Sequence, residues 1–129
     1  MPVYDADRFD PPAPVASVAI RHPGTGVSLS DVPMLMDSGA DVTLIPREVT
    51  EKLEIVPVVD KVYEIQDFDG SIHIAEMVQL ELVFLSKRFK GQFLIIDQPI
   101  GIMGRNILNA VAILLDGPNV QWDEHKPND

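Results

Sequence analysis

The sequence predicts an all-β domain that is closed or nearly closed, and three observations lead to this fold class. Apolar segments are short, and turn signals recur about every ten residues, as in small barrels and sandwiches. The chain has no long amphipathic helix and no internal repeat. An Asp69-Gly70 pair separates two extended runs, and such a pair strongly favours a tight hairpin.

The length of 129 residues fits one domain with its own core. We divide the chain into a flexible, acidic and proline-rich arm (residues 1–14), the domain itself (15–122) and a polar tail (123–129). Hydrophobic residues make up 46% of the chain, which excludes a disordered protein. The chain has no cysteine, so disulfides, a thiol nucleophile and cysteine metal sites are excluded.

The formal net charge of −10 disfavours nucleic acid and anionic membranes as partners. It mildly favours neutral or basic peptides, although a solvated acidic surface explains the same charge. No apolar run approaches the roughly 18 residues that a membrane span needs, so we expect no membrane insertion. We expect a cytoplasmic protein, because nothing in the sequence argues for an oxidising compartment or resembles a secretory signal.

The first strands are predicted from extended apolar runs and their punctuation. Residues 15–21 alternate imperfectly and end at a turn rich in proline and glycine, residues 22–26. A return strand begins at residues 27–29, and we expect Pro33 to interrupt it before a second apolar strand, residues 34–36.

The middle of the chain combines a short helix with a long hairpin. Residues 42–45 form an apolar strand, and residues 46–53 a helix with two apolar residues four apart. Residues 55–59 are expected to be a connecting strand. Residues 63–85 form the clearest hairpin, whose return strand is long and mostly alternating.

The C-terminal third repeats this pattern of short elements. Strands are predicted at residues 93–96 and 102–104, and a short helix at 105–110. A last hairpin joins residues 111–115 to 120–122 through an Asp-Gly-Pro-Asn turn.

The most informative stretch is the one in which residues 34–36 run directly into Asp37, Ser38 and Gly39. A carboxylate at the end of a buried strand is costly unless it is paired, and a glycine lets another backbone approach closely. This layout is suited to holding a carboxyl group still in a sheltered place. The alternative is an aspartate that caps its own turn, which aspartates do readily.

A second segment makes a resemblance specific. Asp37-Ser38-Gly39-Ala40 resembles the active-site loop of aspartic proteases, and residues 100–108 resemble the apolar-apolar-Gly-Arg-Asn segment that follows the flap in retroviral-type proteases. The order of the two motifs and the interval from Asp37 to Gly104 suit a one-lobed retropepsin-like protein. The resemblance covers about residues 15–122. It implies a retropepsin-like closed β-barrel, in a stand-alone, bacterial-like form because the chain starts at Met1.

This resemblance implies an aspartic endopeptidase that acts on polypeptides as a homodimer. Its mechanism needs two carboxyl groups that share one proton, and the chain has one such motif, so Asp37 of each of two subunits would meet at a twofold axis. By resemblance, Ser38 bonds across that axis and Gly39 permits the close approach. The loop would be supported by Ala40 and Thr43.

The resemblance also assigns the second motif. Arg105 would form an intrachain ion pair with Asp41 that braces the loop, whereas alone it reads as a surface arginine at a helix end. The other members of this motif are Ile102, Met103, Gly104 and Asn106.

The tip of the long hairpin would be the flap that closes over substrate, although an ordinary exposed hairpin fits the sequence equally well. Phe68 would shield the site from water. The candidate flap residues are Gln66, Asp67, Phe68, Asp69, Gly70 and Ser71. One glycine and two acids depart from the glycine-rich retroviral tips. The hairpin after residue 110 is a second departure, because retroviral chains end soon after their helix in an interfacial strand.

Other chemistry finds little support in the sequence. His22, His73 and His125 are scattered without metal-ligand spacing, and no phosphate-binding glycine loop is present. We therefore expect no metal and no cofactor. The alternative function is a catalytically silent retropepsin-like module that binds peptides or dimerises, which the acidic flap and the altered C-terminus leave open.

Overall fold

The computed structural model describes residues 2–66 and 69–127 and consists mainly of strands. The elements are β1 Val15–Arg21, β2 Ser28–Met36, β3 Leu44–Pro46, α1 Arg47–Lys52, β4 Val62–Gln66, β5 Ile72–Phe84, β6 Lys87–Ile96, β7 Gly101–Met103, α2 Arg105–Leu108, β8 Ile113–Asp116 and β9 Gln121–Glu124. Among these described residues, no helix is long and apolar enough to cross a membrane.

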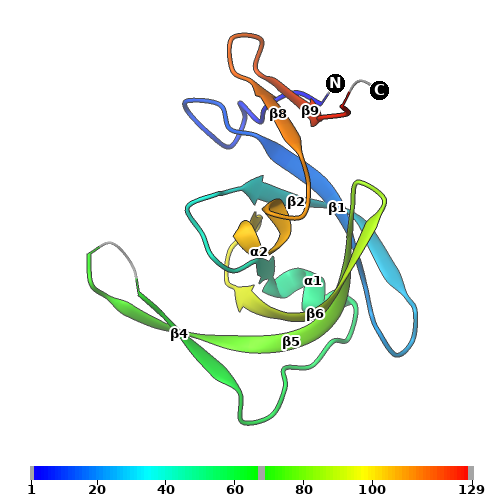
Figure 1. Ribbon diagram of the computed structural model, residues 1–129. Coiled ribbons are helices and arrows are strands. Elements are labelled where there is room, and N and C mark those ends of the chain that lie inside the picture. Colours follow the sequence, from blue (N-terminus) through cyan, green and yellow to red (C-terminus); the bar gives the residue numbers. More distant parts are fainter. Residues whose placement is uncertain (1, 67–68, 128–129) are drawn as a thin grey trace.

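Six strands close into a barrel in the order β1-β2-β7-β3-β6-β5, and β5 pairs with β1 again (Figure 1). Most pairs are antiparallel, whereas β2 with β7 and β3 with β6 are parallel. The closure confirms the predicted all-β barrel and leaves no open sheet edge on the barrel itself.

The core lies inside this barrel and is made by alternate residues of several strands. Ile20, Met34, Ile45, Leu82 and Met103 are all fully buried there. Helix α1 covers one side through Val49 and Leu53, which are buried as the sequence predicted. The domain therefore has one principal core around which the loops are placed.

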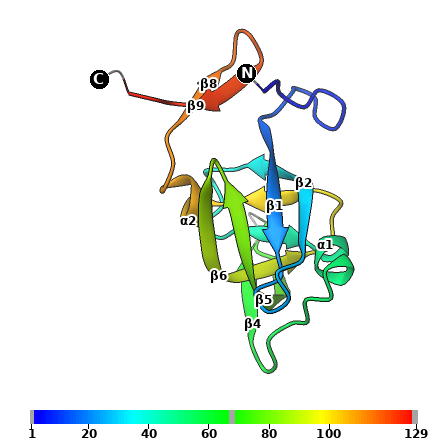
Figure 2. The ribbon, with the colours of Figure 1, turned by 90° about the vertical axis from the view of Figure 1, so that its right-hand side faces the viewer.

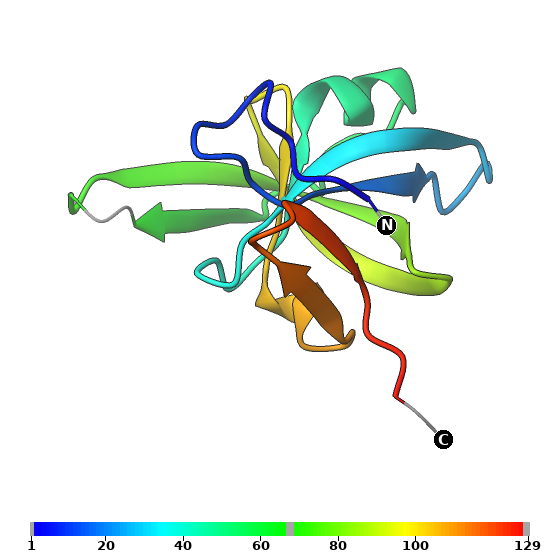
Figure 3. The ribbon, with the colours of Figure 1, turned by 90° about the horizontal axis from the view of Figure 1, so that it is seen from above.

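The β4–β5 hairpin projects from the barrel, as the green ribbon in Figure 3 shows. Gln66 lies opposite Ile72 at its outer end. Strand β5 continues for 13 residues from this hairpin into the barrel wall, which confirms the predicted long return strand. The hairpin is therefore continuous with the barrel wall through β5.

A second, small sheet lies beyond one end of the barrel (Figure 2). Strands β8 and β9 form it as the predicted last hairpin. Trp122 of β9 is buried and its ring lies 6.0 Å from that of Phe84, so the hairpin is anchored on the barrel core.

Two predictions about strands are wrong. Strand β2 runs through Pro33 without interruption. Met36 N–H donates to Pro14 O (3.1 Å) on the β1 side, so the nitrogen of Pro33, three residues earlier, faces the β7 side. Pairing with β7 begins only at Met34, so the missing N–H of Pro33 costs no hydrogen bond. Residues 55–59 form no strand, and a single backbone bond, Val58 N–H to Met77 O (2.7 Å), joins them to β5.

The N-terminal segment is not a free arm. Tyr4 N–H donates to Val120 O (2.8 Å) and Trp122 N–H to Pro2 O (2.9 Å), so the segment pairs with β9. Tyr4 also packs against the core. The proline-rich composition alone did not predict this pairing, in which backbone groups of both segments find hydrogen-bond partners.

Candidate active site

The loop that carries Asp37 is placed by two parallel strands. Met36 ends β2 beside Met103, which ends β7, and Asp37 N–H donates to Met103 O (3.0 Å). The Asp37 side chain is half-buried, and its Oδ1 accepts Gly39 N–H (2.9 Å). Ala40 N–H donates to Asp37 O (3.1 Å). Asp37 thus caps its own turn and is also held at a fixed point on the barrel, so the two readings of this residue are compatible.

Gly39 leaves room for the Asp37 carboxylate. A β-carbon at this position would lie 3.1 Å from Asp37 Oδ1, tighter than nine in ten real contacts. A side chain at residue 39 would therefore require the carboxylate to shift by a few tenths of an ångström. Ser38 and Gly39 are both exposed at the tip of the loop.

Buried Thr43 joins the loop to the second motif. Its Oγ1 donates to Asn106 Oδ1 (2.7 Å) and accepts Gly104 N–H (3.1 Å). A β-carbon at Gly104 would overlap the Val42 carbonyl group. Arg105 N–H donates to Ala40 O (2.8 Å). The structure therefore brings together the two segments that the sequence singled out in distant parts of the chain, and glycine is needed where they touch.

The predicted ion pair between Asp41 and Arg105 is not formed in the described structure. Arg105 Nη1 donates to Ser38 O (2.8 Å), and within the described residues no ion pair joins Arg105 to Asp41. The guanidinium is long enough to reach the loop tip, where the Ser38 carbonyl accepts it. The Arg105 side chain therefore still contacts the active-site loop, but it binds a backbone carbonyl of the loop and not a carboxylate.

The flap candidates lie partly outside the described residues, since Asp67 and Phe68 are not among them. Asp69 Oδ1 accepts the N–H and the hydroxyl of Ser71 (2.9 and 2.6 Å), and these bonds hold the pKa of Asp69 below its ordinary value. Gly70 has φ +86°, a conformation in which other residues are strained. Gly70 takes the positive φ that the Asp69-Gly70 pair predicted, but five residues, 67–71, lie between the paired Gln66 and Ile72, so the hairpin loop is longer than the predicted two-residue turn.

A cavity of about 450 Å³ is lined both by the loop that carries Asp37 and by the outer end of β4. Ile65 and Gln66 of β4 lie on one side of it and Asp37 on the other. The remaining lining residues are Gly39, Ala40, Asp41, Val42 and Leu44. This arrangement places a carboxylate in a cavity beneath a hairpin, as an extended peptide under a flap requires.

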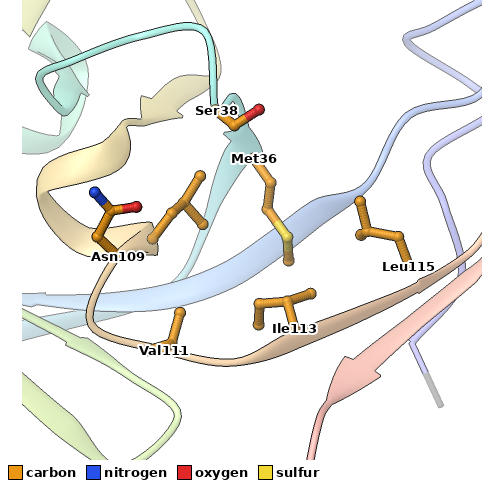
Figure 4. A pocket seen from close by; sticks show the side chains of 7 residues that line it. Met36, Ser38, Asn109, Val111, Ile113 and Leu115 are labelled. Atoms are coloured by element: carbon orange, nitrogen blue, oxygen red, sulfur yellow. The ribbon is translucent and has the colours of Figure 1, made fainter.

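A second groove, of about 310 Å³, shares no lining residue with the first cavity (Figure 4). Its lining includes Ser38 and is otherwise almost all apolar: Met36, Leu108, Asn109, Val111, Ile113 and Leu115. The sequence reasoning missed this groove. Its signal was the unbroken apolar run at residues 111–115, which is more than a short strand with one buried face needs.

Residues 102 and 103 of the second motif belong to the barrel. Ile102 packs against a smaller cluster around Leu44, and Met103 is buried in the main core. Within residues 2–66 and 69–127, no group of three or more His, Asp or Glu side chains is arranged to hold a metal ion.

Comparison with known proteins agrees with this architecture. The family model described as retroviral aspartyl protease matches residues 12–116. Among solved structures, the EIAV protease complexed with the inhibitor HBY-793 superposes with a TM-score of 0.57 at 21% identity, over 76% of this chain and 86% of that chain. The similarity to the EIAV protease concerns the fold alone, whereas the family model covers most of the sequence. The chain belongs to the retroviral aspartyl protease family, whose retropepsin-like barrel it shares.

Proposed function

We propose that the protein is an aspartic endopeptidase in which two subunits each contribute Asp37 to one active site. The observation that carries this proposal is the position of Asp37: the carboxylate is fixed by Gly39 N–H at the end of β2 and opens into the cavity under the β4–β5 hairpin. Family membership supports the same chemistry.

The mechanism follows from two carboxyl groups at a short distance. Two carboxyl groups in contact cannot both ionise, because their negative charges repel, so the pair holds one proton between them. The ionised carboxylate takes a proton from water as the water oxygen bonds to the peptide carbonyl carbon, and the protonated carboxyl gives its proton to the carbonyl oxygen. The tetrahedral intermediate then collapses: the C–N bond breaks as the nitrogen takes the proton that came from water, and the second carboxylate takes back a proton from a hydroxyl of the intermediate. Only Asp37 occupies such a position in the described chain, so its partner comes from a second copy.

The apolar groove and strand β8 support a second copy on the face next to Asp37. Leu114 and Leu115 of β8 are 50% and 55% exposed, and Leu115 borders the groove that also contains Ser38. Exposed leucines in a strand at the active-site loop are typical of an interface.

The backbone of β8 points in the same direction. Trp122 directs its N–H to Pro2, away from β8, and Trp122 lies opposite Leu115. In an antiparallel pair of this kind both residues turn their backbone groups outward, so those of Leu115, and of Ile113 two residues earlier, face the open edge. Within the described residues nothing bonds to them. A second β8 related by a twofold axis fits this edge.

The substitution Asp37→Asn tests the chemistry. It keeps the size of the side chain and an oxygen that accepts Gly39 N–H, but it removes the shared proton. We expect a folded, dimeric protein whose kcat on a cleaved peptide falls by at least about 10³-fold. Asp31→Asn is the control, because Asp31 is exposed on β2, far along the strand from the loop, and asparagine tolerates its φ of 58°.

Two results would contradict the proposal. Undiminished cleavage by Asp37→Asn would exclude the shared carboxyl pair. Absence of any cleavage by the wild-type dimer, together with failure to bind a pepstatin-type inhibitor, would favour the catalytically silent module, which uses the same fold to bind peptides or to dimerise.

A further inference from the structure

The cavity under the flap has walls of two different kinds. Val42, Leu44 and Ile65 supply apolar surface, and the carboxylates of Asp37 and Asp41 supply negative charge. None of the described residues that line the cavity is basic. The cavity, of about 450 Å³, is large enough for a long side chain.

The carboxylate of Asp41 is not used by the fold. The side chain is exposed, and in the described part of the chain no hydrogen bond or ion pair is made to it. Arg105, the cation expected to neutralise it, donates to Ser38 O instead. The carboxylate oxygens of Asp41 are therefore available to a group that enters the cavity.

We infer that Asp41 makes this cavity selective for a substrate side chain with a positive charge at the end of an aliphatic stem, that is, lysine or arginine. The inference rests on the proposed function and defines its substrate class. The stem packs on Val42, Leu44 and Ile65 while the charged end reaches Asp41, since such side chains bury their stems and keep their charges at the rim. An acidic side chain in the same place is repelled by the carboxylate of Asp41.

The twofold symmetry of the proposed dimer adds a consequence. Each subunit supplies one such cavity, and the two lie on opposite sides of the shared carboxyl pair. A substrate that runs between them therefore offers one side chain to each. We expect the preference for a basic residue at two positions, one on each side of the scissile bond.

The test uses peptides that differ only in the charge of one side chain. A peptide that the wild-type enzyme cleaves is made with lysine, norleucine or glutamate at each position close to the scissile bond, on both sides of it. We expect kcat/KM for lysine to exceed that for norleucine by roughly five- to tenfold at one position on each side, and glutamate to be the poorest.

The variant Asp41→Asn tests whether Asp41 causes the preference for lysine over norleucine. We expect the ratio of lysine to norleucine to fall to about one in this variant, and Asp41→Glu to retain a ratio above one. Asp60→Asn is the matched control, because Asp60 is exposed, lies outside the cavity and has a φ of 61° that asparagine tolerates. It changes the net charge by the same amount and must leave the ratio unchanged.

The outcomes separate this inference from the proposed function. Cleavage with equal kcat/KM for lysine and norleucine at every position would overturn the inference and leave the aspartic protease in place. The same holds if Asp41→Asn keeps the wild-type ratio or if Asp60→Asn loses it. Cleavage of no peptide by the wild-type protein would overturn both.

Discussion

Thr43 is the residue on which the geometry of the candidate site depends most. Its side chain is 1% exposed and makes two hydrogen bonds, one to Asn106 and one from Gly104. These bonds join the segment after β2 to the segment after β7, and the hydroxyl is the buried side-chain link that accompanies the bond from Arg105 N–H to Ala40 O. A buried hydroxyl of this kind is costly to lose because its partners stay buried.

The substitution Thr43→Val tests this role, since it keeps the shape of the side chain and removes the hydroxyl. Gly104 N–H and Asn106 Oδ1 lose their partner, so we expect a loss of about 1–3 kcal/mol in the free energy of unfolding. Urea denaturation measures it. Thr43→Ser keeps the hydroxyl and is expected to lose much less than Thr43→Val does. Equal losses in the two variants would show that the methyl group, and not the hydroxyl, stabilises the site.

Sequence reasoning at this scale identified residue types better than their contacts. Asp37 was found because a charge directly after a buried strand, with a glycine close by, is unusual, and the second motif was found through its resemblance to the segment after the flap in retroviral-type proteases. The target of Arg105 was predicted wrongly, because a long flexible side chain has several acceptors within reach and the loop conformation decides between them. Ser38 O is that acceptor here.

At the scale of elements, three strands are joined by one buried charge where the barrel closes. Glu81 of β5 lies opposite Arg21 of β1 and opposite Lys90 of β6, and it accepts from both at 3.2 Å. The side chain of Glu81 is 7% exposed, whereas its two partners are largely exposed. The bond from Lys90, and then that from Arg21, holds the pKa of Glu81 below its ordinary value despite the burial.

This lowered pKa gives the barrel a predicted pH dependence. Because the unfolded chain binds the proton more tightly, Glu81 stabilises the fold fully above its unfolded pKa of about 4.3. The contribution is lost as the pH falls through the lower pKa of the folded state. We expect Glu81→Gln to melt below the wild type at pH 7 and the difference in Tm to shrink steadily from about pH 5 downwards.

Thermal denaturation from pH 7 to pH 3 measures this difference. Glu48→Gln is the control, because Glu48 pairs with Lys52 on the exposed face of α1, and such pairs contribute little. A difference between wild type and Glu81→Gln that stays constant over the whole pH range would show that the charge of Glu81 is not what stabilises the closure.

Elements with a local cause were predictable, and those with a distant cause were not. The Asp69-Gly70 hairpin and the helix after Pro46 follow from neighbouring residues. The continuity of β2 through Pro33 depends on where β7 begins to pair, at Gly101 in the last third of the chain. The ordered N-terminal segment likewise depends on β9, which lies at the other end of the sequence.

At the scale of the whole molecule, the closed barrel followed from its short strands, turns and family resemblance, but the face that a second copy would use did not. That face combines the tip of the active-site loop with β8, and only the fold brings them together. The groove between them contains Met36 and Leu115, which are distant in the sequence. Leu115 belongs to the apolar run at residues 111–115, but no local pattern indicates that Met36 lines the same groove.

The proposed dimer predicts how activity depends on concentration. A monomer holds one Asp37 and therefore half a site, so the rate is expected to rise as the square of protein concentration below the dimer Kd and linearly above it, by mass action. Each subunit carries a formal charge of −10, so added salt is expected to strengthen the dimer by screening the repulsion between subunits.

The substitution Leu115→Lys places this dependence on β8. Leu115 is 55% exposed at the open edge, so a lysine there leaves the barrel intact but brings a charge into the proposed interface. We expect the dimer Kd to rise at least about tenfold, and the activity per dimer to return at high protein concentration. Val120→Lys is the matched control, since Val120 is 45% exposed in the turn before β9 and is not among the residues that line the groove. Sedimentation and peptide cleavage measured on the same dilution series decide the matter: wild-type samples that are monomeric by sedimentation and yet keep a constant specific activity would refute the shared site.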